Sequence, residues 1–156
     1  QTGFIFALSL LLFTSSGLAL SPAPDDARIR ELQKERDRLL KVKDPVDRSK
    51  IGIRISELLL DEVADSVRDG NFVKLQEQLS DYSETIEEAH QTLVDSGRNA
   101  QKSAGGFKDL EISLRKQERR LGDYVKMLTI DRREPLEKAK NLAKTIHDKL
   151  IKALFP

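Results

Sequence analysis

Apolar residues recur every three or four positions along most of this chain, which is the spacing of one face of an α-helix. The clearest row lies between residues 72 and 93, where steps of three and four residues form a heptad seam. Its members are Phe72, Leu75, Leu79, Tyr82, Ile86, Ala89 and Leu93. This pattern predicts an all-α protein built as an antiparallel bundle of four to five helices.

Two helical segments are predicted ahead of that row. The first runs from about Asp25 to Val42 and is weakly amphipathic, because Arg36 falls on its apolar stripe. That stripe consists of Ile29, Leu32, Leu39 and Val42. The second segment runs from about Pro45 to Arg68, with Asp44 as its N-cap and Pro45 in its first turn.

Two further segments are predicted after the row, which should stop at Gly97. A polar stretch from Arg98 to Gly106 is expected to be the one flexible loop. The fourth segment then starts at Phe107 and repeats the seam spacing up to Leu128, with Gln117 interrupting it midway. The fifth starts near Pro135, and its apolar row contains small residues that allow close helix packing: Leu136, Ala139, Ala143, Ile146, Leu150 and Ala153.

The N-terminal stretch differs from all of these segments. Phe4 to Phe13 is apolar apart from Ser9, and small and polar residues follow it. This order predicts a signal peptide over residues 1–21, cleaved after Ala19, and a single helical domain over residues 22–156. No Met or basic residue precedes Phe4, so we expect the signal to be cut short at its start. The alternative is an uncleaved membrane anchor, since Phe4 to Leu20 reaches the lower length limit for a bilayer span.

Composition narrows the chemistry of this exported domain, which we expect to be periplasmic or extracellular. The chain has no Cys, which excludes disulfides, thiolate metal sites and a cysteine nucleophile. Ser21 stands where a lipoprotein would need its acylated cysteine. Charged residues make up 34% of the chain and aromatic residues only 5%, which favours a helical bundle over a sheet.

Charge is unevenly distributed along the sequence. Residues 57–98 contain eleven acidic and three basic residues, whereas residues 108–152 contain thirteen basic and eight acidic residues. One interpretation is a set of solvated faces with mild attraction between the acidic middle and its basic neighbours. The other is a basic interaction surface on the last two helices, made of Arg119, Arg120, Arg132, Arg133, Lys140 and Lys144.

Catalytic and metal-binding patterns are missing from the sequence. A di-metal bundle needs a Glu-x-x-His motif on each of two helices. Glu87 and His90 form one such motif, but the second histidine, His147, has Lys144 three residues before it in place of Glu. The carboxylates are spread along helix faces, and no nucleophile turn or phosphate loop is present. We therefore predict no enzyme activity, no catalytic residue, no metal and no cofactor. Export and the scarcity of aromatic residues also argue against nucleic-acid binding.

Two resemblances point to a binding role. Gly70 and Phe72, around Asn71, resemble the turn of a tetratricopeptide-type helical hairpin, although Leu75 stands where that family has alanine. The chain is also similar to uncharacterised exported helical proteins of bacteria, through Asp44-Pro45, Gly70-Asn71-Phe72 and Gly105-Gly106-Phe107. The first resemblance implies an interaction module with Gly70, Asn71 and Phe72 as a structural turn, and the second implies no known activity.

Together these features predict an exported, non-catalytic helical protein that acts in protein–protein interaction or as an envelope structural or adaptor module. Its partner would be another protein or a second copy of the chain. The alternative function is a peripheral binder of anionic membrane or wall polymer, which would use the basic C-terminal helices. In that alternative the apolar side of the last helix, with Leu154 and Phe155, would face the membrane, although a bundle core would use the same stripe.

Overall fold

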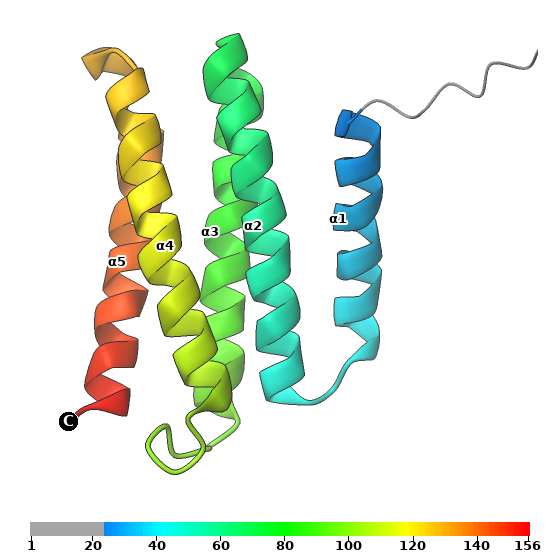
Figure 1. Cartoon of the computed structure of the whole chain (residues 1–156), viewed down its shortest axis with the longest axis vertical. Coiled ribbons are helices and arrows are strands. Elements are labelled where there is room, and N and C mark those ends of the chain that lie inside the picture. The colour runs from blue at the N-terminus through cyan, green and yellow to red at the C-terminus, as the bar shows by residue number, and fades with distance from the viewer. Residues whose placement is uncertain (1–23) are drawn as a thin grey trace, which may run out of the picture.

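The computed structural model describes residues 24–156, so the predicted signal segment lies outside the described residues. The described part contains five α-helices, one short 3-10 helix and no strand, which confirms the predicted all-α fold (Figure 1). The elements are α1 (Pro24–Lys41), α2 (Pro45–Asp69), α3 (Phe72–Asp95), α4 (Gly105–Met127), η1 (Ile130–Arg132) and α5 (Glu134–Leu154).

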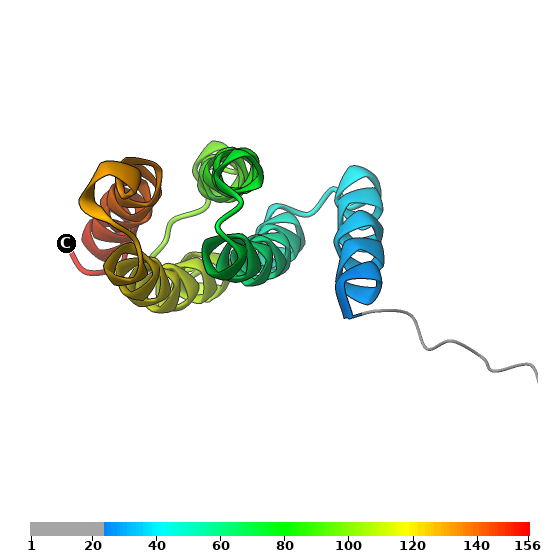
Figure 2. The same ribbon diagram turned by 90° about the horizontal axis from the view of Figure 1, so that it is seen from above.

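Helices α2 to α5 form a four-helix bundle, and α1 lies outside it against α2 (Figures 1 and 2). Consecutive helices run antiparallel. The hairpins α2–α3 and α4–α5 lie side by side, so that α2 packs on α4 and α3 packs on α5. Each of these two pairs runs in the same direction, because the connection from α3 to α4 crosses the end of the bundle.

The helix ends follow from local capping chemistry. The Asp44 side chain accepts hydrogen bonds from the backbone N–H groups of Val46 (2.9 Å) and Asp47 (3.1 Å) and so begins α2. Gly70 ends α2 with φ 68°, a left-handed conformation that side chains with a Cβ rarely adopt. The Asn71 side chain then accepts from the Lys74 N–H at 3.1 Å and begins α3.

The predicted seams form the core. In α3 every member of the heptad row is buried except Phe72, which is partly buried and packs against the core. The row in α4 is buried from Phe107 to Leu121, Gln117 included, and Tyr124 is partly buried. In α5 the row ends differently, because Ala153 is exposed and Leu154 is buried in its place. An α-helix has 3.6 residues per turn, whereas a heptad seam repeats every 3.5 residues. Over about five turns the buried side therefore shifts by one residue, from Ala153 to Leu154.

The predicted loop over residues 98–106 is too long at its C-terminal end. Helix α4 begins at Gly105, and Gly106 is buried in its first turn. A Cβ at Gly106 would lie 2.8 Å from Leu93 Cδ2 and 3.3 Å from Val46 Cγ2. This glycine therefore permits close packing of α4 on α3 and α2, and it does not belong to a flexible loop.

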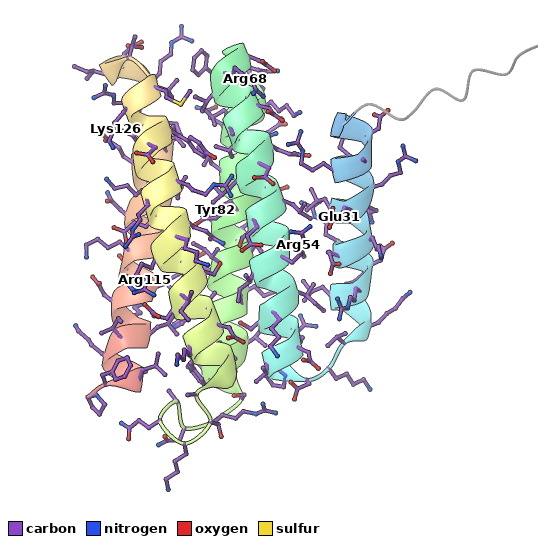
Figure 3. The ribbon with its side chains drawn as sticks, viewed as in Figure 1. Glu31, Arg54, Arg68, Tyr82, Arg115 and Lys126 are labelled. Carbon is purple, nitrogen blue, oxygen red and sulfur yellow. The ribbon has the colours of Figure 1, made fainter. Side chains whose placement is uncertain are left out.

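Helix α1 contacts α2 through Leu32, Leu39, several ion pairs and one cap. Of its predicted stripe, Leu32 is buried and Ile29 is 52% exposed. Arg28 pairs with Asp65 of α2, and Glu31 pairs with Arg54 of α2 (Figure 3). Arg48 of α2 donates to the carbonyl oxygens of Leu39 (2.9 Å) and Val42 (3.2 Å) at the end of α1. These contacts fix α1 on the outer side of α2.

Candidate binding surface at the end of the bundle

Two turns meet at one end of the bundle, which we call the apical end. Gly70 and Asn71 form the turn between α2 and α3, and residues 128–133 form the turn between α4 and α5. Both turns lie at the top of Figure 1, opposite the C-terminus. Because alternate turns of an antiparallel bundle fall at the same end, Phe72 at the start of α3 lies near η1 and the start of α5.

Arg132 of η1 stacks on the ring of Phe72. Its guanidinium carbon lies 3.9 Å from the ring centroid, which is the geometry of a cation–π contact. The sequence singled out these two residues for different reasons, Phe72 for a turn and Arg132 for a basic surface. The structure brings them together across two turns that are 60 residues apart.

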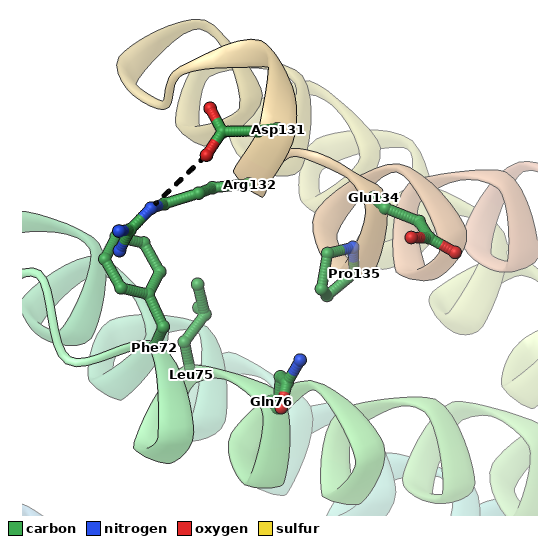
Figure 4. Close-up of a pocket in the computed structure, with 7 residues that line it drawn as sticks. All are labelled: Phe72, Leu75, Gln76, Asp131, Arg132, Glu134 and Pro135. Carbon is green, nitrogen blue, oxygen red and sulfur yellow. Dashed lines mark ion pairs between the residues drawn. The ribbon is translucent and has the colours of Figure 1, made fainter.

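A pocket of about 210 Å³ opens beside this stack (Figure 4). The buried Leu75 and the partly buried Pro135 and Phe72 contribute its apolar surface, and polar groups stand around them. We call it the apical pocket, lined by Phe72, Leu75, Gln76, Asp131, Arg132, Glu134 and Pro135. Sites for drug-sized ligands or cofactors usually measure about 300–1,000 Å³, so this pocket suits a single side chain of a partner.

Both carboxylates of the pocket are held in the charged form. The Thr129 hydroxyl, the Asp131 N–H and then the nearby Arg132 lower the pKa of the Asp131 carboxyl. Lys138 lies 2.7 Å from Glu134 and lowers the pKa of that carboxyl. The pocket therefore carries one fixed cation and two carboxylates around an apolar floor, and neither acid is available as a proton donor at neutral pH.

Exposed apolar side chains also gather at the apical end. Val73 at the start of α3 is 71% exposed, Met127 at the end of α4 is 62% exposed, and Ile130 in η1 is 83% exposed. These three residues come from different elements. Exposed apolar side chains next to a pocket are common at protein interfaces.

The six cations of the predicted basic surface differ in their contacts. Arg120 turns toward α2 and pairs with Asp61 at 2.6 Å, and Lys144 pairs with Asp148 at 2.9 Å. Arg133 donates to the Leu128 carbonyl oxygen at 2.8 Å, close to the Arg132 stack. Arg119 and Lys140 have no ion pair among the described residues.

The histidines lie away from the apical pocket. His147 of α5 is 3.0 Å from Glu111 and 3.9 Å from Glu118, both on α4. Burial, and then the positive charge of Lys149, lower the pKa of the His90 imidazole. Within residues 24–156 no group of three or more His, Asp or Glu side chains is arranged to hold a metal ion.

A buried polar cluster lies in the middle of the bundle. Tyr82, which is labelled in Figure 3, donates to Gln117 Oε1 at 3.0 Å. Gln117 Nε2 donates to the hydroxyls of Ser56 and Ser113 at 2.8 Å each. Burial raises the pKa of the Tyr82 phenol. All four side chains are buried, so this cluster joins α2, α3 and α4 without facing solvent.

None of the described helices is both long enough and apolar enough to cross a membrane. The apolar side of α5 is used in the core, where Leu136, Ile146, Leu150 and Leu154 are buried, whereas Phe155 directly after the helix is 69% exposed. That side is therefore not free to insert into a lipid surface.

Comparison with known proteins finds no match to a family model, to a curated protein or to a solved structure.

Proposed function

We propose that this chain is an exported, non-catalytic helical module that acts in protein–protein interaction, as an adaptor or a structural element of the cell envelope. The apical pocket carries the proposal. Its volume suits one side chain, and its Arg132–Phe72 stack is already formed in the free chain. Preformed pockets that accept an anchoring side chain are where binding energy concentrates at protein interfaces.

The apical surface also fits the way such interfaces are composed. Val73, Met127 and Ile130 supply apolar area, and Arg132 supplies the cation type most enriched at interfaces. The remaining polar groups of the pocket, Gln76 and the two carboxylates, can fix the orientation of a partner segment. The partner in this proposal is another protein.

Site-specific photo-cross-linking tests the proposal. A photoreactive amino acid is placed at Val73 or Ile130, and at Lys152 near the C-terminus as the control, in cells that export the chain. We expect the same protein adduct from both apical positions and none from Lys152. The adduct should disappear in an Arg132→Glu variant whose helix content is unchanged. Equal labelling at all three positions, or no protein adduct, would contradict the proposal.

Binding to an anionic membrane or wall polymer is the second candidate function, and Arg119 and Lys140 favour it because no carboxylate of the described chain pairs with them. With the apolar side of α5 buried up to Leu154, such binding would be mainly electrostatic. Co-sedimentation with vesicles of anionic phospholipid should then be abolished in about 0.5 M salt, where charges are screened within a few ångström. Binding that survives this salt concentration would contradict the electrostatic mode.

A further inference from the structure

Helix α1 presents a row of unpaired cations to solvent. Arg30, Lys34 and Lys41 are exposed and form no ion pair with the described chain. They lie within about 40° of one another around the helix and span about 16 Å along it. The same side of α1 contains a hollow of about 520 Å³. Its one carboxylate, Asp37, accepts a hydrogen bond from Gln33 at 2.8 Å. We call Arg30, Lys34 and Lys41 the α1 basic stripe.

Helix α3 presents the opposite charge. Glu77, Glu84 and Glu87 are exposed and also lack an ion pair within the described chain. They share one side of α3 and span about 15 Å. Lys74 is the only Lys or Arg of this helix. We call these three glutamates the α3 acidic stripe.

The α1 basic stripe is held in a fixed orientation by the opposite side of the helix. Arg28 and Glu31 pair with Asp65 and Arg54 of α2, and Leu32 is buried in the core. Arg36 reaches α3 and pairs with Asp81 at 2.8 Å. These contacts occupy the inner charges of α1 and leave the outer ones available to another molecule.

We propose that the α1 basic stripe of one copy docks on the α3 acidic stripe of a second copy. The two stripes match in number of charges and in length, and they share no residue. Each copy therefore offers both halves of the contact at once. A contact between two different surfaces of identical chains repeats, and it produces rings or open chains according to the rotation between copies.

Such an assembly is independent of the apical pocket but changes its use. Neither stripe includes a residue that lines the pocket. Several pockets carried on one assembly would bind a repeated partner with higher avidity than a single pocket.

Charge reversal on each stripe tests the contact, because mixing the two reversed variants restores opposite charges across it. One variant carries Arg30→Glu, Lys34→Glu and Lys41→Glu, and the other carries Glu77→Lys, Glu84→Lys and Glu87→Lys. Sedimentation velocity is measured on chain recovered from cells that export it, in about 20 mM and about 0.5 M salt. We expect the wild type to associate with increasing concentration in low salt and to be monomeric in high salt. Each variant alone should be monomeric, and an equimolar mixture of the two should associate again.

A control variant reverses two other exposed cations, Lys149→Glu and Lys152→Glu on α5, and should associate as the wild type does. Circular dichroism verifies that all variants keep their helix content, which is expected because Lys, Arg and Glu have similar helix propensities. A wild type that stays monomeric in low salt would overturn the inference, as would a mixture that does not associate. Either result leaves the cross-linking test at Ile130 unaffected, because Ile130 belongs to η1 and neither stripe does.

Discussion

Gln117 occupies a seam position where the neighbouring members are leucines, and its partners explain why an amide is accommodated there. The Tyr82 hydroxyl, Ser56 and Ser113 satisfy its side chain inside the core. A buried hydrogen-bonded cluster stabilises only modestly in net terms, but a member left without its partner costs more. The main effect of the cluster is therefore to fix the register of three helices relative to one another. Its net contribution to stability is small.

This argument predicts a specific pattern in a double-mutant cycle. Gln117→Leu should lower the free energy of unfolding by about 1–3 kcal/mol, because the Tyr82 hydroxyl is left buried without an acceptor. Adding Tyr82→Phe removes that hydroxyl, so the double variant should recover part of the loss. Urea denaturation of the four proteins measures the coupling. Strictly additive effects would show that the two side chains do not depend on each other.

His90 makes stability depend on pH in a known direction. Its pKa is lower in the folded chain than the value of about 6.5 expected for an unfolded one, first through burial and then through Lys149. The unfolded chain therefore binds the proton more readily. Stability is unaffected by this residue above about pH 6.5 and falls as the pH drops toward the folded pKa.

We accordingly expect His90→Gln to reduce the loss of unfolding free energy between pH 8 and pH 5. Lys149→Met should reduce it by less, because it removes only the second cause of the shift. Urea unfolding at the two pH values provides the measurement. A variant whose pH profile superimposes on that of the wild type would rule out His90 as a contributor.

At the scale of the helices, the two adjacent glycines at the start of α4 have different surroundings. A Cβ at Gly106 would collide with Leu93, whereas a Cβ at Gly105 would meet no atom within 4 Å. Gly106→Ala should therefore destabilise the bundle by about 1–3 kcal/mol through overpacking. Gly105→Ala is the matched control and should be neutral or stabilise by up to about 1 kcal/mol. Thermal unfolding of both variants decides the point, and equal effects would contradict the packing role of Gly106.

These helices also show what periodicity can and cannot predict. The α3 and α4 seams were predictable because burial repeats with the turn of the helix, and the Gly70 turn was predictable because its chemistry is local. Gly106 was misassigned because a glycine in a helix gives the same sequence signal as a glycine in a loop. Ile29 was expected in the core, but α1 packs on one helix only and leaves that residue largely exposed.

Sequence periodicity could not predict the apical pocket, for a different reason. Phe72 and Arg132 were each singled out, but their contact depends on which turns share an end of the bundle. That arrangement follows from the antiparallel order of the helices. Sequence spacing therefore named two members of the pocket and missed the other five as pocket-lining residues, because nothing local marks Leu75 and Gln76 as neighbours of η1.

For the whole molecule, the uneven charge of the sequence is largely balanced between elements. The acidic α2–α3 hairpin receives Arg28 and Arg36 from α1 and Arg120 from α4. Arg48 pairs with Glu88 within the hairpin at 2.7 Å. Partly exposed pairs of this kind contribute about 0–1 kcal/mol each, so they orient α1 more than they stabilise it.

Helix α1 should consequently open before the bundle does. It packs on α2 alone and buries a single apolar side chain, Leu32, whereas each bundle helix packs on at least two others. Hydrogen exchange of residues 27–41 should occur through a local opening with a lower free energy than global unfolding. Leu32→Ala should lower α1 protection while the urea midpoint of the bundle changes little. If α1 exchanged only when the whole chain unfolds, α1 would be an integral part of the cooperative core, and this prediction would be wrong.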